Sequence, residues 1–280
     1  MRKNLHNHYL VLGGTGSIGW AITEALLTRG DHVTIANRDI TLTDEQNSFV
    51  EDLEDEFYDD NNEDEEMVQS GKEYYKDLDE DELPDIRTTP LDSAALDVTD
   101  AGETAEFPFR FLDDELAVII YAVGSCPPGC FEQAIKTPLS QLENVRLMDD
   151  IHLHVVGLKN VLCQEKMFEA LKPGAHVVVI GSAITRITDE QCPPWLYAGH
   201  YAVAKAAQAE LIKWLRRDPR VKEKGILIHH ICPSAVDTPF HQDCERRPPV
   251  LLPLSAVTQK VMEALASPIA LDVMVLPEPS

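Results

Sequence analysis

The sequence predicts one α/β domain built on a doubly wound parallel sheet, with helices on both faces in three layers, α/β/α. Three observations carry this prediction. Short apolar runs alternate with stretches of helical periodicity along most of the chain. The first run ends in a glycine-rich turn that opens a helix. The chain has 280 residues, 44% of them hydrophobic, which suffices for one sizeable core. We therefore treat residues 1–280 as a single domain.

The first apolar run, residues 9–12, leads into the glycine turn. Its glycines follow the spacing GxxGxxG, and residues 20–27 continue with helical periodicity. Such a turn lets the backbone approach a pyrophosphate and places that anion at a helix N-terminus, where free amides and the dipole favour negative charge. The flanking strand and helix favour a Rossmann-like dinucleotide site over a plain tight turn. The residues expected to contact the cofactor here are Gly13, Thr15, Gly16, Ser17, Ile18 and Gly19.

Residues 32–36 are expected to form the second strand. Asn37 and Arg38 stand at its carboxyl end, where dinucleotide sites select the ribose. Arg38 can pair with a 2′-phosphate, which favours NADP over NAD as the cofactor. Asp39 keeps the alternative open, because its carboxylate could accept from the 2′-hydroxyl of NAD while Arg38 stays solvated.

A helix should follow, because Thr43 and Gln46 resemble a capping box ahead of an apolar helical face. From residue 58 to residue 85 the composition becomes acidic and nearly free of aliphatic side chains. Such a segment buries too little surface to offset its ordering entropy, so we expect a disordered or loosely helical surface insertion. It is either a solvated excursion without function or a docking segment for a basic partner.

The net charge of −24 is mostly local to this part of the chain. Positions 44 to 85 hold 20 acidic residues and two lysines, a net of −18, which leaves −6 elsewhere. The balance disfavours nucleic acid as a partner. No segment approaches the roughly 20 apolar residues of a membrane span, and the start of the chain does not resemble a signal peptide.

The six cysteines lack paired CxxC spacing, which indicates free thiols in a reducing, cytoplasmic location. Cys126 and Cys130 have no second ligand pair at a suitable spacing, so no metal site is predicted. The remaining strands are expected at residues 95–98, 116–121, 175–180, 226–231 and 271–276, and long helical stretches at residues 139–171 and 256–265.

Tyr201 and Lys205 are four residues apart in a run of helix formers, so they share one helical face. A phenol with a pKa of about 10 is a poor base near neutral pH, and lowering that pKa by some 3 units requires roughly 4 kcal/mol. An ammonium about 7 Å away supplies about 2.4 kcal/mol at an effective dielectric of about 20. Lys205 would therefore need a second positive charge nearby, such as an oxidised nicotinamide ring.

In order along nearly the whole chain, these motifs resemble the short-chain dehydrogenase/reductase family. The glycine turn is similar to the family's own, and Tyr201 with Lys205 is similar to its YxxxK pair. Ser182 resembles its catalytic serine, and Asp97 and Val98 resemble its adenine-contacting Asp-Val pair. Ala122 and Gly124 resemble its NAG segment, and Pro233, Val236 and Thr238 resemble its PGxVxT loop.

The resemblance implies an NADP-dependent oxidoreductase that acts on a small-molecule carbonyl or secondary alcohol, assembled as a homodimer or homotetramer. Tyr201 would exchange a proton with the substrate oxygen, and Ser182 would hold that oxygen. Lys205 would hold the ribose and lower the phenol pKa. His200, next to Tyr201, is expected to be structural.

The chain departs from the family pattern at four places. His154 stands where the family has the asparagine of the proton relay, so we include it among the candidate catalytic residues. Ser182 precedes Tyr201 by 19 positions, a longer separation than is usual in the family. Ser234 replaces the glycine of PGxVxT, and the acidic insertion lies where the family has a short connection.

Two other functions compete with this one. Nucleotide-sugar epimerases and dehydratases share the glycine and YxxxK motifs, but they resemble longer chains than this one, in which about forty residues follow Thr238. A regulatory or scaffold protein that binds NADPH without catalysis is the other alternative. Such a protein would not need Ser182, Tyr201 and Lys205 together.

Overall fold

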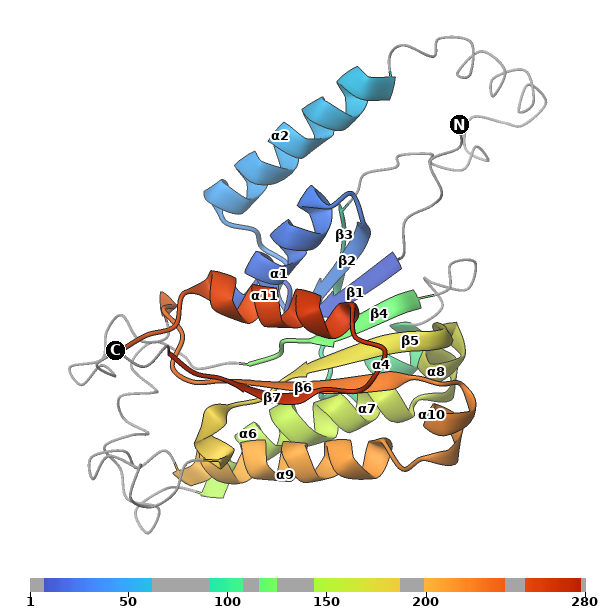
Figure 1. The fold of residues 1–280 in the computed structure, drawn as a ribbon, viewed down its shortest axis with the longest axis vertical. Helices are drawn as coiled ribbons and strands as arrows, with labels where there is room; N and C mark the ends of the chain where they lie inside the picture. Colours follow the sequence, from blue (N-terminus) through green and yellow to red (C-terminus); the bar gives the residue numbers. More distant parts are fainter. Residues whose placement is uncertain are drawn as a thin grey trace.

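The structure is a computed structural model that describes residues 8–61, 91–107, 116–124, 144–186, 199–239 and 250–277 (Figure 1). Seven parallel strands form one sheet in the order β3-β2-β1-β4-β5-β6-β7. The order reverses between β1 and β4, which is where ligands of doubly wound sheets bind. The predicted fold class is confirmed. The strands are β1 (His8–Leu12), β2 (His32–Asn37), β3 (Leu91–Ala95), β4 (Leu116–Tyr121), β5 (Leu171–Ile180), β6 (Leu227–Pro233) and β7 (Asp272–Val275).

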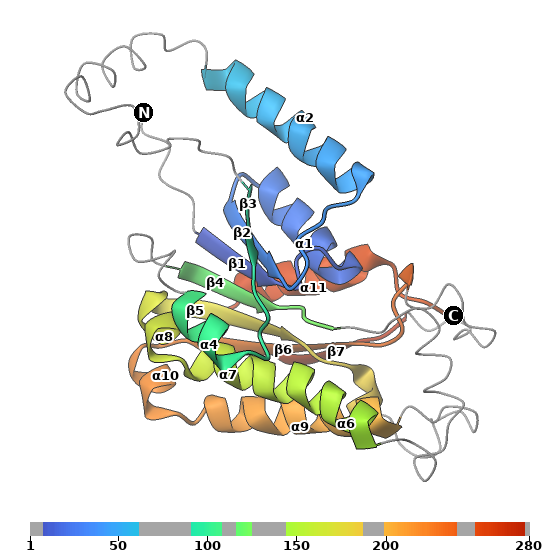
Figure 2. The same cartoon turned by 180° about the vertical axis from the view of Figure 1, so that it is seen from behind.

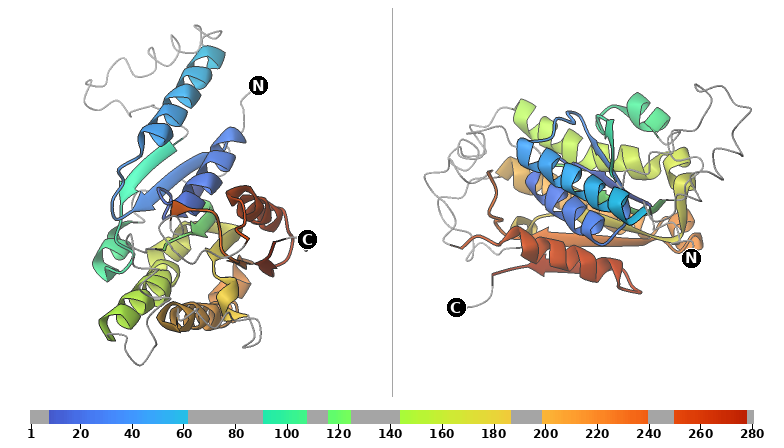
Figure 3. Two further views of the ribbon diagram at one scale, coloured as in Figure 1. Left: turned by 90° about the vertical axis from the view of Figure 1, so that its left-hand side faces the viewer. Right: turned by 90° about the horizontal axis from the view of Figure 1, so that it is seen from above.

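Helices cover both faces of the sheet. Figures 1 and 2 show α1 and α11 on one face and α6, α7 and α9 on the other. The second helix, α2, extends beyond the body of the domain (Figure 3). The helices are α1 (Ser17–Thr28), α2 (Asp44–Asn61), α4 (Ala101–Glu106), α6 (Asn144–Ile151), α7 (Gly157–Cys163), α8 (Glu165–Ala170), α9 (Gly199–Leu215), α10 (Pro219–Glu223) and α11 (Leu254–Leu265).

The core consists of two apolar clusters, one on each face of the sheet, because successive strand residues point to opposite faces. In β4, Val118 and Ile120 pack toward α1 and α11, whereas Ile119 and Tyr121 pack toward α7 and α9. All six residues of β4 are buried, as expected for a central strand of a parallel sheet. The sheet is therefore rigid where its strands end at the candidate site.

The third strand was predicted wrongly. Residues 95–98 are not a strand: β3 ends at Ala95, and Asp97 and Val98 lie in the turn that follows. The reason is that β3 is an edge strand with the sequence LDSAA and three exposed residues, so it lacks the apolar run that identifies a buried strand. The other predicted strands are confirmed within a few residues at their ends.

The long helix expected over residues 139–171 is interrupted. α6 runs into a π-helical turn, His152–Val156, and α7 then ends before Gln164, whose backbone is extended. Leu171 already belongs to β5. Residues 139–143 lie outside the described residues. Gly157 stands where the π-helical turn passes into α7, but neither glycine nor proline marks the break at Gln164.

The predicted capping box of α2 is present. The backbone N–H of Thr43 donates to Gln46 Oε1 at 2.9 Å, and that of Gln46 donates to Thr43 Oγ1 at 3.2 Å. The helix continues to Asn61, so residues 58–61 of the expected insertion belong to it. Residues 62–85 lie outside the described residues. No helix in the described ranges combines the length and the apolar character that crossing a bilayer requires.

Candidate functional site

The glycine turn follows β1 at the edge where the parallel strands end. Gly13 has a φ of +81°, which favours glycine, and a Cβ there would lie 2.8 Å from the carbonyl oxygen of Ala122. A Cβ on Gly19 would lie 2.1 Å from the carbonyl oxygen of Gly13. A Cβ on Gly16 would meet its nearest atom at 3.4 Å, an ordinary contact. Gly13 and Gly19 are thus needed for packing, whereas the packing of the protein itself would tolerate a Cβ on Gly16.

Gly16 is also the N-cap of α1. It has no side chain that could accept from the first amides of the helix, which belong to Ser17, Ile18 and Gly19. Free amides at a helix N-terminus, next to a backbone stripped of Cβ atoms, form a cradle for an anion. The predicted pyrophosphate-binding residues of this turn therefore lie together.

Two side chains from other elements support the glycine turn. The Asn37 amide, at the end of β2, donates to Thr15 Oγ1, and Gln46 Nε2 donates to the Thr15 carbonyl oxygen at 3.2 Å. Thr15 and Asn37 were predicted as cofactor contacts, and here they contact one another. Gln46 was recognised as a capping residue only. Its second bond links the first turn of α2 to the glycine turn, and no sequence motif indicates it.

Arg38 and Asp39 follow β2 and are exposed. Asp39 Oδ1 accepts from the backbone N–H of Thr41 at 3.0 Å and from its hydroxyl at 2.7 Å, and these bonds lower the pKa of the carboxyl. One oxygen of the Asp39 carboxylate is thus already hydrogen-bonded within the turn that follows β2.

Asp97 and Val98 lie between β3 and α4. Asp97 Oδ1 accepts from Thr99, at 2.9 Å from its N–H and 2.7 Å from its hydroxyl. Val98 is buried, and Asn160 Nδ2 of α7 donates to its carbonyl oxygen at 3.1 Å. Asn160 thus holds this turn beside the sheet, a role that sequence reasoning missed because the contact spans 62 positions.

The π-helical turn brings two carbonyl oxygens within reach of side chains. The hydroxyl of Tyr121 donates to the Leu153 oxygen at 2.6 Å, and Gln208 Nε2 donates to the His154 oxygen at 3.1 Å. These contacts attach the turn to β4 and to α9. π-Helical turns are rare and are frequent at functional sites. This turn is therefore a further indication that the functional site extends toward α9 at the carboxyl ends of the strands.

His154 and Tyr201 meet at this point. Their ring centroids are 5.7 Å apart in an edge-to-face arrangement. His154 is 1% exposed, and its Nδ1 has no hydrogen-bond partner in the described structure. Burial, and secondarily the charge of Lys205, lowers the pKa of His154 well below its ordinary value, so the imidazole is neutral.

Lys205 reaches the same place from one turn further along α9. Its Nζ lies 5.8 Å from the centroid of the Tyr201 ring, and donates to the Ile180 carbonyl oxygen at 3.0 Å and to Gln208 Oε1 at 3.2 Å. Burial lowers the pKa of Lys205 to about 7. Gln208 therefore links Lys205 to the carbonyl of His154. Sequence reasoning missed it, although its position three residues after Lys205, on the same helical face, was a usable signal.

Ser182 stands two residues beyond Ile180, at the end of β5. It caps a short 3₁₀ turn, Ala183–Thr185, and its Oγ accepts from the backbone N–H of Ile184 at 3.3 Å. The hydroxyl proton stays available for donation to another oxygen. Ser182 and the ammonium of Lys205 thus share the carboxyl end of β5.

The loop after β6 contributes the last predicted residues. Pro233 ends β6, and Thr238 Oγ1 donates to the Val236 carbonyl oxygen at 3.4 Å. Ser234, the residue at the family's glycine position, is half-buried, and its buried Oγ has no hydrogen-bond partner in the described structure. Ala122 and Gly124 follow β4, where the N–H of Ala122 donates to the Leu12 carbonyl oxygen at 2.9 Å. Both segments lie at the carboxyl ends of strands of the same parallel sheet, β6 and β4.

The side chain of His200 contacts α6. Its Nδ1 lies 2.5 Å from Asp150 Oδ2, and both side chains are largely buried. The pair joins the start of α9 to α6, which gives His200 a structural contact.

The described architecture is the fold of short-chain dehydrogenases and reductases. An alcohol dehydrogenase from Thermococcus sibiricus, solved with 5-hydroxy-NADP, matches with a TM-score of 0.65 at 18% identity, over 98% of this chain and 99% of the other. A short-chain dehydrogenase from Burkholderia cenocepacia with NADP gives 0.63 at 16% identity, over 97% and 89% of the two chains. One from Sphingobium yanoikuyae with NADPH gives 0.64 at 16%, over 98% and 89%.

At these identities the likeness is one of fold. No family model matches the sequence, and no curated protein matches it significantly.

Proposed function

We propose that this chain is an NADP-dependent oxidoreductase of the short-chain dehydrogenase/reductase type, acting on a carbonyl or secondary alcohol. The observation that carries the proposal is the buried cluster around Tyr201. His154 packs against its ring, and the Lys205 ammonium lies 5.8 Å from the ring centroid. Burying a lysine costs free energy, and such groups concentrate at functional sites.

The glycine turn fits the cofactor. Gly16 leaves open space where a Cβ would otherwise stand, and the first amides of α1 are uncapped. In the proposal the pyrophosphate binds there, Arg38 pairs with the 2′-phosphate, and Lys205 holds the nicotinamide-side ribose. When bound, NADP supplies the hydride transfer. The segments at Asp97 and Val98, at Ala122 and Gly124, and at Pro233, Val236 and Thr238 line the rest of the cofactor site.

The chain's own residues then handle the proton. The Tyr201 hydroxyl exchanges it with the substrate oxygen, while the Ser182 hydroxyl donates a hydrogen bond to that oxygen. The Lys205 ammonium stabilises the phenolate form of Tyr201 by its charge. His154 occupies the asparagine position of the family's relay as a neutral imidazole with an open Nδ1, which makes it the candidate relay group. Gln208 keeps Lys205 in place.

Arg38 is the group proposed to select NADP. The Asp39 carboxylate accepts two bonds from Thr41, which supports Arg38 rather than Asp39 as the ribose-selecting residue. We expect NADPH to bind at least about tenfold more tightly than NADH, or about 1.4 kcal/mol, and Arg38→Ala to abolish that preference. Titration of both cofactors by fluorescence measures it. Equal affinities in the native chain would contradict this part of the proposal.

The activity is tested by following NADPH absorbance with a panel of aldehydes, ketones and quinones. Turnover of at least one compound, lost in Tyr201→Phe, is the expected result. NADPH binding without any turnover across the panel would favour a regulatory or scaffold protein instead.

We extend the proposal to a homodimer or homotetramer in the cytoplasm. Cys163 and Cys232 are unpaired thiols, which supports a reducing compartment. Light scattering on the full chain measures the oligomeric state, and a monomer at micromolar concentration would contradict it.

A further inference from the structure

Three metal-ligating side chains gather on the α9 face of β6 and β7, outside the residues proposed for catalysis. His230 and Cys232 are two residues apart in β6, so they point to the same face. Asp272 pairs directly with His230 in the register of the two strands. His230 Nδ1 lies 3.3 Å from Asp272 Oδ1 and 3.6 Å from Cys232 Sγ. One ligand atom from each of the three lies within 4.8 Å of the other two.

These separations match the edges of a tetrahedral metal site. Zinc binds imidazole nitrogen and carboxylate oxygen at about 2.0–2.2 Å and thiolate sulfur at about 2.3 Å, so neighbouring ligand atoms stand about 3.3–3.7 Å apart. The two measured distances from His230 Nδ1 fall in this range. The backbone pairing of β6 with β7 also limits how far the ligands can relax away from one another.

The imidazole of His230 is fixed for this role. Its ring is 2% exposed and packs against Gly181, where a Cβ would lie 2.2 Å from Nε2. Nδ1 lies 3.3 Å from Asp272 Oδ1 and 3.6 Å from Cys232 Sγ, and Nε2, beside Gly181, lies 3.3 Å from the same sulfur.

We propose that His230, Cys232 and Asp272 bind one borderline divalent cation of the Zn²⁺ class, with water as the fourth ligand. Cys232 is fully buried, whereas Asp272 is 39% exposed, so the water enters from the side of the edge strand β7. The sequence analysis considered Cys126 and Cys130 for a metal and missed this set, because Asp272 lies forty positions after Cys232.

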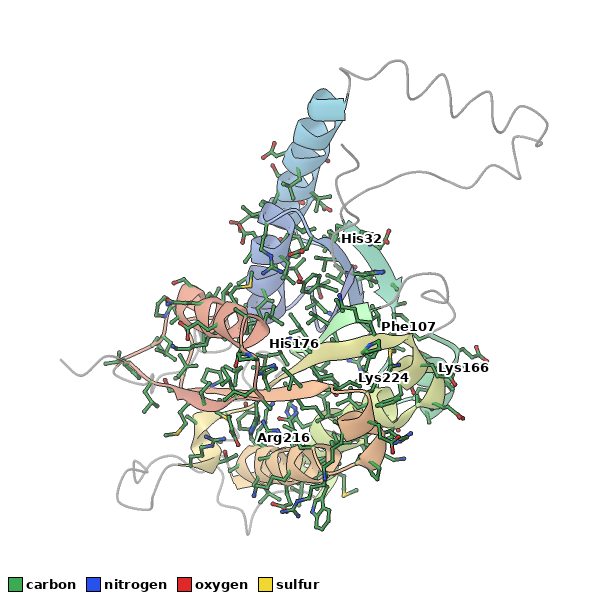
Figure 4. All side chains as sticks on the ribbon, turned by 45° about the vertical axis from the view of Figure 1, so that its right-hand side comes forward. His32, Phe107, Lys166, His176, Arg216 and Lys224 are labelled. Carbon is green, nitrogen blue, oxygen red and sulfur yellow. The ribbon has the colours of Figure 1, made fainter. Side chains whose placement is uncertain are left out.

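Two arginines complete the surroundings of Asp272. Arg216 Nη1 lies 3.6 Å from Asp272 Oδ2, and Arg216 also donates to the carbonyl oxygens of Ile228 and Leu271 (Figure 4). Arg216 is therefore placed to orient the Asp272 carboxylate, as groups that contact a metal ligand orient that ligand. Arg186 pairs with Oδ1, the oxygen that faces His230, and so competes with the cation. Without a metal, the same groups form a plain ion-pair network.

The site is tested with Co²⁺ as the probe, because cobalt occupies zinc sites and reports thiolate ligation by a near-ultraviolet charge-transfer band. The full chain carries Cys126→Ser, Cys130→Ser, Cys192→Ser and Cys244→Ser, so that only Cys163 and Cys232 remain. We expect one Co²⁺ per chain, with that band and the intense visible bands of tetrahedral cobalt. Added Zn²⁺ should displace the cobalt.

Matched variants decide between the metal site and the ion-pair network. Cys232→Ser should remove the charge-transfer band, and Cys163→Ser should keep it. Asp272→Asn, at a half-exposed position, should weaken Co²⁺ binding at least about tenfold. Arg186→Ala should strengthen it, because the competing cation is gone. Circular dichroism verifies that each variant is folded. No band in the folded background chain, or a band that survives Cys232→Ser, would overturn the proposal. Neither readout depends on oxidoreductase activity.

Discussion

At the end of β1 the candidate site consists of backbone, whereas at the start of α9 it consists of buried side chains. The glycine turn acts by what it lacks: Gly13 and Gly19 have no Cβ to obstruct packing, and Gly16 leaves space for a ligand. In the proposed function the α9 side acts through Tyr201 and Lys205, and the Lys205 ammonium is held by the carbonyl oxygen of Ile180, 25 positions away.

This difference determines how each side responds to substitution. Adding atoms to the glycine turn should harm binding or packing, and removing atoms from the α9 side should harm chemistry. The three experiments that follow test this contrast, in order of decreasing effect.

Tyr201→Phe keeps the ring packed against His154 and deletes the hydroxyl. If Tyr201 is the acid and base, kcat should fall by about two to four orders of magnitude while NADPH affinity changes little. Steady-state kinetics and cofactor titration measure the two quantities. Tyr9→Phe is the matched control, since its hydroxyl contacts Arg29. A Tyr201→Phe enzyme with the native kcat would show that Tyr201 is not the acid and base.

Two glycine substitutions separate packing from binding within the turn. Gly19→Ala places a Cβ 2.1 Å from the Gly13 carbonyl oxygen, so it should lower the free energy of unfolding by about 1–3 kcal/mol. Gly16→Ala has room and a φ of −75°, so its stability should stay within about 1 kcal/mol of the native value. Its NADPH affinity should nevertheless fall at least about tenfold.

Chemical denaturation and NADPH titration on both variants provide the measurement. Native NADPH affinity in Gly16→Ala would mean that the pyrophosphate does not approach the backbone at that position.

Burial of Lys205 should appear as a pH dependence of stability. Its pKa is about 7 in the folded chain and about 10.4 when unfolded. Below pH 7 both states are protonated and the full cost of burying the charge destabilises the fold. As pH rises from about 7 toward 10, the unfolded state binds more protons, so the free energy of unfolding increases.

Lys205→Met removes this dependence. Between about pH 6 and pH 9 the native chain should therefore gain on the order of 2 kcal/mol relative to the variant. Lys213→Met, at an exposed position of the same helix, is the control. Parallel stability curves for native and Lys205→Met chains would show that Lys205 is solvated rather than buried.

The backbone half was readable from the sequence because its requirements are local. Glycine spacing, one strand and one helix lie within about twenty positions, and the apolar runs of β1, β2, β4, β5 and β6 identify buried strands directly. The edge strand β7 was found because its residues are also mostly apolar. The prediction missed β3 because an edge strand needs no continuous apolar run, and its residues LDSAA therefore carry no strand signature.

The side-chain half was readable only in part. Ser182, Tyr201 and Lys205 were found through family motifs, but their supports were not. The π-helical turn follows no compositional rule, and Gln208 reaches a carbonyl 54 positions away. The Asn160 bond to Val98 and the grouping of Asp272 with His230 are equally remote. Contacts of this kind depend on how the helices dock on the sheet, which local sequence does not encode.

The bond from Gln46 to Thr15 gives the acidic helix α2 a share in events at the glycine turn. Gln46 is both the capping partner of Thr43 and a support of the turn, so we expect the first turn of α2 and the glycine turn to stabilise one another. Thermodynamic linkage makes such a coupling reciprocal. A ligand that orders the glycine turn should then protect the start of α2 from hydrogen exchange, and a macromolecule that binds α2 should alter the affinity of the turn for its ligand by the same factor.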